Sequence, residues 1–119
     1  MTPDGFRRAA LALPEAIESA HMNHPDFRVG GRIFATLGYP DEGFGMVLLT
    51  PEQQDMFMRV APKAFAPSKG AWGRGGSTTV DLKRIDAALL RDALDAAFRS
   101  AVEKTAKKKS TPRKKKTER

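Results

Sequence analysis

The sequence contains no cysteine, and this absence excludes several classes of protein at once. Without thiols there is no disulfide framework, no cysteine nucleophile and no cysteine-based zinc module, and the composition suits a reducing compartment. Long hydrophobic runs are also missing, since no stretch approaches the roughly 18 to 20 apolar residues of a membrane-spanning helix. The N-terminus lacks the basic and then apolar order of a signal peptide. We therefore expect a cytoplasmic protein that has no membrane partner.

Aromatic residues are scarce, at 8% of 119 residues with a single tryptophan, but 40% of the chain is hydrophobic. This fraction is enough to build one small core, and the chain is too short for two domains. Wholesale disorder is excluded for the same reason.

Positive charge exceeds negative charge by seven, and the location of the excess matters more than its size. Residues 1–103 carry 12 basic and 13 acidic side chains, whereas residues 104–119 carry nine basic side chains and one acidic side chain. Apolar spacing ends beyond Val102, and Pro112 and the mutual repulsion of the lysines oppose a long helix there. We predict a folded domain over residues 1–103 and a disordered Lys/Arg-rich tail over residues 104–119.

The N-terminal segment has the signals of a short amphipathic helix. Thr2 is a typical N-cap residue, and Pro3 suits the first helical position. Phe6 and Ala10 then share one face, and Pro14 cannot continue the helix.

Between residues 17 and 49 the pattern changes to short strands separated by turns. The strand-like runs are residues 27–29, 32–39 and 44–49, divided by the Gly30-Gly31 pair and by a turn over residues 40–43. Within residues 32–39, strict alternation places odd-numbered and even-numbered side chains on opposite faces. We predict an antiparallel meander with one face toward the helices.

A second helix and a glycine-rich stretch follow. Thr50 and Gln53 have the spacing of a capping box, and Met56, Phe57 and Val60 follow at helical spacing. Residues 70–76 are predicted to form a loop.

The single tryptophan, Trp72, lies in this stretch, and we expect it to close the core. The alternative is a flexible wing that brings Lys69 and Arg74 to a nucleic-acid backbone. Residues 78–82 alternate as one more strand, and from the N-cap Asp86 an apolar stripe defines a long final helix. Together these elements predict an α+β fold in which N- and C-terminal helices pack on one face of an antiparallel sheet.

Four motifs in this order carry a family resemblance. They are Leu13-Pro14, the block HPDFRVGGRIFA at residues 24–35, Thr50-Pro51-Glu52, and WGRGGSTTVDL at residues 72–82. Together they span the globular part, and the chain resembles the MmcQ/YjbR family. The resemblance implies a CyaY-like fold and DNA binding through a double-wing pair of hairpins. Two departures stand out: Ser77 replaces a residue that is often aromatic in such proteins, and the basic tail lies outside the shared region.

No catalytic or metal-binding motif stands out. His21, His24 and Asp26 have the chemistry of metal ligands, but residues three apart on a strand face opposite sides and no third strong ligand is indicated. No nucleophile has a local base with an orienting partner. Residues 70–76 lack the ending of a P-loop and precede a strand. We predict a non-enzymatic protein with no metal and no other cofactor.

Basic side chains in two loops and in the tail are the candidate DNA contacts. Arg28 and Arg32 flank the Gly30-Gly31 turn, where both guanidinium groups could reach phosphates. Asp41 and Glu42 in the next turn would repel them. The predicted nucleic-acid-binding residues are Arg28, Arg32, Lys69, Arg74, Lys107, Lys108, Lys109, Arg113, Lys114, Lys115 and Lys116.

These features predict weakly specific binding to double-stranded DNA, with the tail adding electrostatic affinity. If five to eight tail charges neutralise phosphates, log K should fall with log salt at a slope of about −4.5 to −7. The alternative is a protein-interaction or small-ligand-binding module whose tail is only a solubility or non-specific polyanion segment. The near-neutral charge of residues 1–103 supports this alternative.

Overall fold

The computed structural model describes the backbone of residues 1–38 and 41–117 and the side chains of residues 1–38 and 41–106. Tyr39 and Pro40 lie outside this range, so the predictions that include them are not tested. The described elements are α1 (Pro3–Leu11), β1 (Ile17–His21), β2 (His24–Val29), β3 (Arg32–Leu37), β4 (Phe44–Leu48), α2 (Pro51–Val60), β5 (Phe65–Pro67), α3 (Gly70–Arg74), β6 (Ser77–Asp81) and α4 (Ala87–Thr117).

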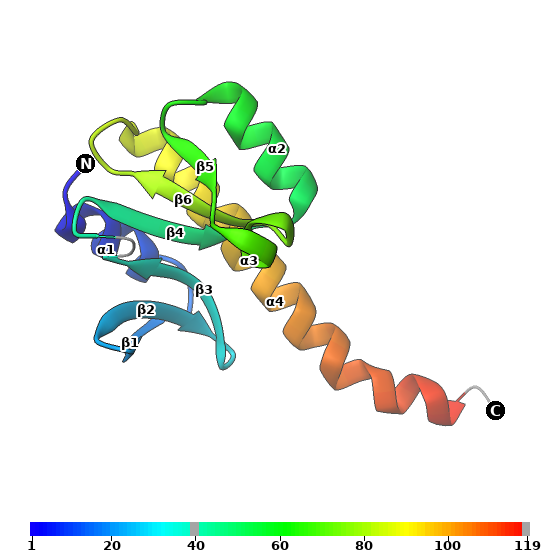
Figure 1. The fold of residues 1–119 in the computed structure, drawn as a ribbon. Coiled ribbons are helices and arrows are strands. Elements are labelled where there is room, and N and C mark those ends of the chain that lie inside the picture. The colour runs from blue at the N-terminus through cyan, green and yellow to red at the C-terminus, as the bar shows by residue number, and fades with distance from the viewer. Residues whose placement is uncertain (39–40, 118–119) are drawn as a thin grey trace.

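The six strands form one antiparallel sheet in the order β1-β2-β3-β4-β6-β5. Helices α1 and α4 pack on one face of this sheet, and α4 passes behind it and continues beyond its edge (Figure 1). Helix α2 lies beside α4, because side chains from both helices line one shallow hollow. The predicted α+β class, with terminal helices on one face of an antiparallel sheet, is confirmed.

Helix α1 forms as its sequence signals predict. The hydroxyl of Thr2 accepts a hydrogen bond of 3.0 Å from the backbone N–H of Gly5, which caps the helix. Phe6 and Ala10 are fully buried. The ring of Phe6 lies 6.0 Å from that of Phe27 and covers Gly45, where a Cβ atom would stand 2.7 Å from the ring. The absence of a side chain at Gly45 therefore lets α1 lie close to the sheet.

The sheet departs from strict alternation at Phe34. The pairing of β2 with β3 matches Phe27 with Ala35 but Arg28 with Ile33, so Phe34 is an extra residue in a β-bulge. The bulge turns Phe34 toward the helices, where it is fully buried and meets Phe98 edge to face at 5.7 Å. The prediction that Phe34 points away from the odd-numbered residues was wrong, because alternation fails at a bulge.

Helix α2 begins with the predicted capping box. The Thr50 hydroxyl accepts from the Gln53 N–H at 3.1 Å, and the Gln53 side chain accepts from the Thr50 N–H at 2.9 Å. Its buried face is narrower than the apolar spacing predicts, since Phe57 is buried but Met56 and Val60 are 51% and 64% exposed. A helix that packs at the margin of a sheet buries only one narrow stripe of its own side chains.

Gln54 occupies the buried stripe of α2 beside Phe57. Its amide nitrogen donates to the carbonyl oxygens of Gly73 at 3.0 Å and Ser77 at 3.1 Å, and to the hydroxyl of Thr78 at 3.2 Å. One side chain therefore links α2 to α3 and to the first residues of β6.

Helix α4 starts at the predicted cap, where the Asp86 carboxylate accepts from the Leu89 N–H at 2.7 Å. The backbone stays helical to Thr117, whereas the sequence predicted the end near Glu103 and no structure in residues 104–119. Lysine and alanine, which dominate residues 104–109, favour helix, and cations suit the C-terminal end of the helix dipole. Packing against the domain reaches Thr105, because a Cβ atom at Gly30 would stand 3.2 Å from its side chain.

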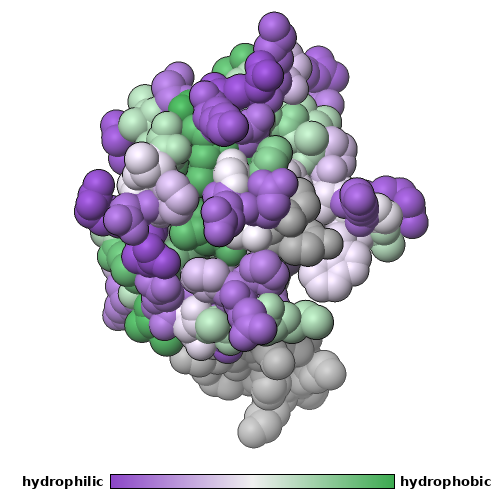
Figure 2. Space-filling view, turned by 60° about the vertical axis from the view of Figure 1, so that its left-hand side comes forward, coloured by the Kyte–Doolittle hydropathy of each residue, from purple (hydrophilic) through white to green (hydrophobic). Residues whose placement is uncertain are grey.

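Exposed apolar side chains are scattered over the described surface. On the face drawn in Figure 2, green apolar patches are bordered by hydrophilic side chains. Within the described residues, no helix has the length and apolar character to cross a bilayer.

Candidate nucleic-acid interface

The turn between β2 and β3 presents the first pair of predicted cations. Gly30 and Gly31 adopt φ angles of 58° and 80°, which together make a tight two-residue turn that residues with side chains rarely allow. Val29 pairs with Arg32 across this turn. Arg32 therefore lies directly beside the turn, and Arg28, paired with Ile33, lies one ladder position further into the sheet.

Arg28 is tied to a buried carboxylate. Its Nε and Nη2 atoms donate to the two oxygens of Asp26 at 2.8 and 3.1 Å, and His21 Nδ1 lies 2.7 Å from the same carboxylate. The Asp26 side chain is fully buried, whereas that of Arg28 is 31% exposed. The hydrogen bonds from Arg28, and secondly from His21, hold the pKa of Asp26 below its usual value of 3.8 despite its burial.

This pairing leaves part of the Arg28 guanidinium available to a ligand. A guanidinium group has five N–H donors, of which Asp26 takes two. The pairing therefore reduces the net positive charge at the turn, but the Arg28 guanidinium keeps N–H groups that can donate to a ligand.

Arg28 and Arg32 share a hollow with the second half of α4. The hollow has a volume of about 390 Å³, and its third cation is Lys104, which no sequence motif connected with the turn. Apolar and small residues complete its lining, and no carboxylate takes part. Arg32 and Lys104 have no ion-pair partner in the part of the chain that the structure describes. Three cations thus converge on one concave surface.

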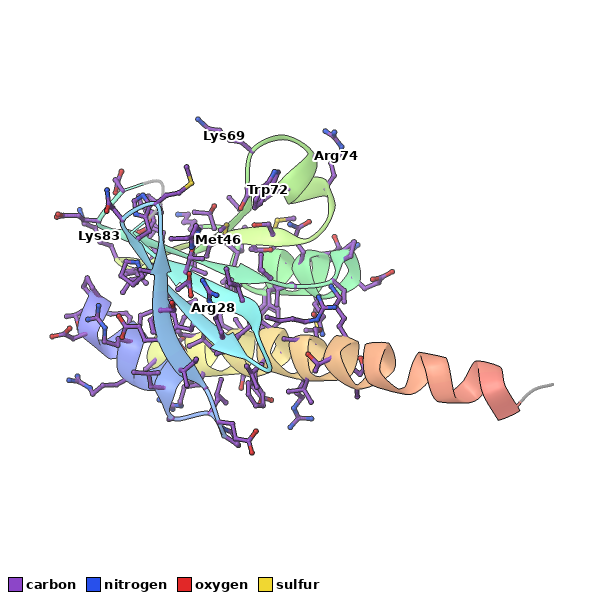
Figure 3. All side chains as sticks on the ribbon, turned by 90° about the horizontal axis from the view of Figure 1, so that it is seen from below. Arg28, Met46, Lys69, Trp72, Arg74 and Lys83 are labelled. Atoms are coloured by element: carbon purple, nitrogen blue, oxygen red, sulfur yellow. The ribbon has the colours of Figure 1, made fainter. Side chains whose placement is uncertain are left out.

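Lys69 and Arg74 lie elsewhere, at the two ends of α3: Lys69 precedes the helix and Arg74 is its last residue. Both side chains are exposed and point away from the body of the domain, while Arg28 lies over the sheet (Figure 3). The structure therefore divides the predicted contacts of the folded domain into a pair at the β2–β3 turn and a pair on residues 68–76, which we call the α3 arm.

The glycine-rich stretch is a short helix, and the prediction of a loop was wrong. A Cβ atom at Gly73 would stand 1.8 Å from the backbone oxygen of Ser68, so α3 lies against the preceding segment through a glycine. Trp72 consequently faces outward and is 72% exposed. The expectation that Trp72 closes the core was wrong because this backbone contact takes the inward position on α3.

The tail cations fall outside the described side chains. Helical backbone is present to Thr117, but nothing tests the contacts predicted for Lys107, Lys108, Lys109, Arg113, Lys114, Lys115 and Lys116.

In the group formed by His21, His24 and Asp26, the Asp26 carboxylate forms an ion pair with Arg28. Arg28 and His21 occupy both oxygens of Asp26. In residues 1–38 and 41–106, no three His, Cys, Asp or Glu side chains come together as metal ligands do.

Sequence reasoning missed two contributors to these surfaces. Lys104 reaches the arginine turn because α4 runs past the end of the sheet, and no local pattern signals that approach. Met22 and Asn23 form the β1–β2 turn with φ angles of 49° and 67°, a conformation that is uncommon for residues other than glycine. The signal available in the sequence was Asn23, a residue type that tolerates positive φ, placed between two short polar runs that form the strands of this hairpin.

Comparisons with known proteins agree with the fold. The family model described as YjbR matches residues 11–100. Among solved structures, the chain is similar to Deinococcus radiodurans protein DR2400, which carries the family-model domain DUF419. The two share 22% sequence identity and a TM-score of 0.66, over 81% of this chain and 75% of that chain. A search of curated proteins finds no match.

Proposed function

The chain belongs to the YjbR family, and from this premise we propose that it is a non-enzymatic protein that binds double-stranded DNA with low sequence specificity. The convergence of Arg28, Arg32 and Lys104 on one hollow is the observation that carries the proposal. Guanidinium and ammonium groups bind phosphate oxygens through charge-assisted hydrogen bonds. A surface that contacts only phosphates fixes position on the duplex without reading sequence.

Helix α4 extends this basic surface. Lys104 lies near the point where α4 leaves the domain, and the helix continues from there into the segment that carries the other lysines. A duplex backbone placed along the hollow would therefore meet further positive charge in the same direction. The domain supplies the position, and the tail supplies most of the electrostatic affinity.

Salt-dependent titration of the full chain with a short duplex tests the proposal. Each phosphate contact that is lost should reduce the slope of log K against log salt by about 0.9. The double variant Arg32→Gln/Lys104→Gln should therefore lower the slope by up to about 1.8. Arg28 is left intact because it holds buried Asp26.

A matched control separates the site from net charge. Lys63→Gln/Lys83→Gln removes the same charge from two exposed positions outside the hollow. The proposal expects little change in slope for this control. An equal loss in both double variants would show that only net charge matters, and no binding by the full chain at low salt would refute DNA binding altogether.

A further inference from the structure

The face of the sheet opposite α1 and α4 carries a second hollow, of about 530 Å³. Its walls are the β1–β2 turn, which contributes Met22, and the α3 arm, which contributes Lys69 and Trp72. Met46 of β4 lies below Trp72 in Figure 3 and helps to form the floor. The volume is within the range of about 300 to 1,000 Å³ that small-ligand sites occupy.

Two large apolar side chains on opposite walls of the hollow are exposed to solvent. Trp72 is 72% exposed and Met22 is 85% exposed, although both could bury a large apolar area. The close contact of Gly73 with Ser68 fixes the outward direction of Trp72. Met22 and Asn23 adopt the two positive φ angles that a two-residue hairpin turn requires, and the turn fixes the place of Met22. Both walls are therefore positioned by the backbone.

The floor of the hollow is also fixed. The sulfur of Met46 accepts hydrogen bonds from the hydroxyls of Ser68 at 3.2 Å and Ser77 at 2.8 Å. These contacts hold the Met46 side chain in one orientation below the arm. The space above it is thus preformed.

The charge of the hollow favours an anion. Lys69, whose side chain extends outward, is the one Lys or Arg among the residues that line the hollow, and none of these residues is a carboxylate. Asp26, which lies beside the lining residue His21, is fully buried and paired with Arg28 and His21. An aromatic ring between Trp72 and Met22 would gain stacking and sulfur contacts, while an attached anionic group would meet Lys69.

We propose that this hollow binds a planar aromatic ring that carries a phosphate, which is the chemistry of a nucleotide. The ring lies between Trp72 and Met22, and the phosphate contacts Lys69. The ligand is either a free nucleotide or an unpaired nucleotide of a strand, because the two share this chemistry. The site uses none of Arg28, Arg32 and Lys104, so it does not depend on the duplex proposal.

The tryptophan provides the assay, because Trp72 is the only tryptophan in the chain. Its fluorescence in the full chain is titrated with adenosine 5′-monophosphate, with adenosine, and with ribose 5-phosphate, which has no aromatic ring. We expect saturable quenching by the nucleotide, weaker binding of adenosine, and no saturable response to ribose 5-phosphate. Quenching by ribose 5-phosphate equal to that by the nucleotide would overturn the proposal, as would the absence of a saturable response to the nucleotide at millimolar concentration.

Variants assign the contacts. Trp72→Ala, measured by calorimetry, should weaken nucleotide binding about 5-fold to 150-fold, the range for loss of one stacked base. Lys69→Gln should weaken binding of the nucleotide but not of adenosine. Lys83→Gln is its matched control, since Lys83 is exposed and lies away from the arm in Figure 3.

The other wall has its own control. Met22→Ala should weaken binding about 2-fold to 10-fold, the range for loss of a sulfur–aromatic contact, whereas Met56→Ala on α2 should have no effect. Both methionines are exposed, so neither substitution should unfold the protein. Equal effects of the two substitutions would refute the assignment of Met22.

A short single-stranded oligothymidylate distinguishes the two sources of the ligand. Binding at least ten-fold tighter than that of the mononucleotide would identify an unpaired strand, and equal binding would identify a free nucleotide; either result supports the site. Duplex binding that survives Trp72→Ala while nucleotide binding is lost would show that the two sites are separate. If the unmodified full chain binds the nucleotide but does not bind the duplex, only the proposed function is refuted.

Discussion

Gly73 lies where the α3 arm meets the backbone of Ser68, and substitution by alanine should disrupt that contact. The added Cβ atom would stand 1.8 Å from the Ser68 oxygen, against a practical minimum of 3.0 Å, so the arm must move by about 1.2 Å. Overpacking of this kind costs about 1 to 3 kcal/mol. Displacement of Gly73 also weakens its hydrogen bond from Gln54, which is 3.0 Å long and contributes about 1 kcal/mol. We expect Gly73→Ala to lower the free energy of unfolding by about 2 to 4 kcal/mol.

Urea denaturation monitored by the fluorescence of Trp72 measures this effect next to the moving segment. Gly75→Ala is the control, since a Cβ atom there would lie 3.6 Å from its nearest neighbours and its φ of −83° suits alanine. This control should leave stability within about 1 kcal/mol of wild type. A Gly73→Ala protein as stable as wild type, with an unchanged emission spectrum, would refute the close contact and with it the physical reason for the exposure of Trp72.

Three further perturbations have directions set by hydrogen bonds in the structure. Arg28, and after it His21, lower the pKa of Asp26, so the stabilisation from the ionised carboxylate is complete above the unfolded value of 3.8 and is lost as pH falls through the lower folded pKa. Urea midpoints measured from pH 7 to 3 should therefore decline more steeply for wild type than for Asp26→Asn. Thr36→Val should stabilise the protein by up to about 1 to 2 kcal/mol in thermal melts, because the buried hydroxyl of Thr36 has no hydrogen-bond partner within the described residues. Thr78→Val should instead destabilise the protein, because it removes the 2.8 Å hydrogen bond from the Thr78 hydroxyl to the Gly76 carbonyl oxygen. Thr50→Ala should lower the melting temperature through loss of the capping box, at a cost of about 0.5 to 2 kcal/mol, and an unchanged melting temperature would contradict the cap.

The features that the sequence predicts well are those that neighbouring residues decide. The caps at Thr2, Thr50 and Asp86 each depend on an oxygen and an N–H group three residues apart, so local spacing is sufficient to place the helices. The Gly30-Gly31 turn is equally local, and with it the pair Arg28 and Arg32.

The features that the sequence does not predict depend on contacts between distant segments. The bulge at Phe34 reflects packing against Phe98 of α4, which lies 64 residues away along the chain. The approach of Lys104 to the arginine turn depends on the path of α4 across the sheet. The pairing of Arg28 with Asp26 is local by contrast, but its effect on the charge of the candidate site depends on the burial of Asp26, which the basic-turn motif does not indicate.

The amide of Gln54 joins three elements through hydrogen bonds inside the domain. Helix α2, the α3 arm and the start of β6 should consequently open together, as one cooperative unit in native-state hydrogen exchange. Among the described strands, β1 in contrast pairs with β2 alone, and all of its residues are exposed. Its amides should exchange through a smaller and more frequent opening, so the two walls of the Trp72 hollow belong to regions of different local stability.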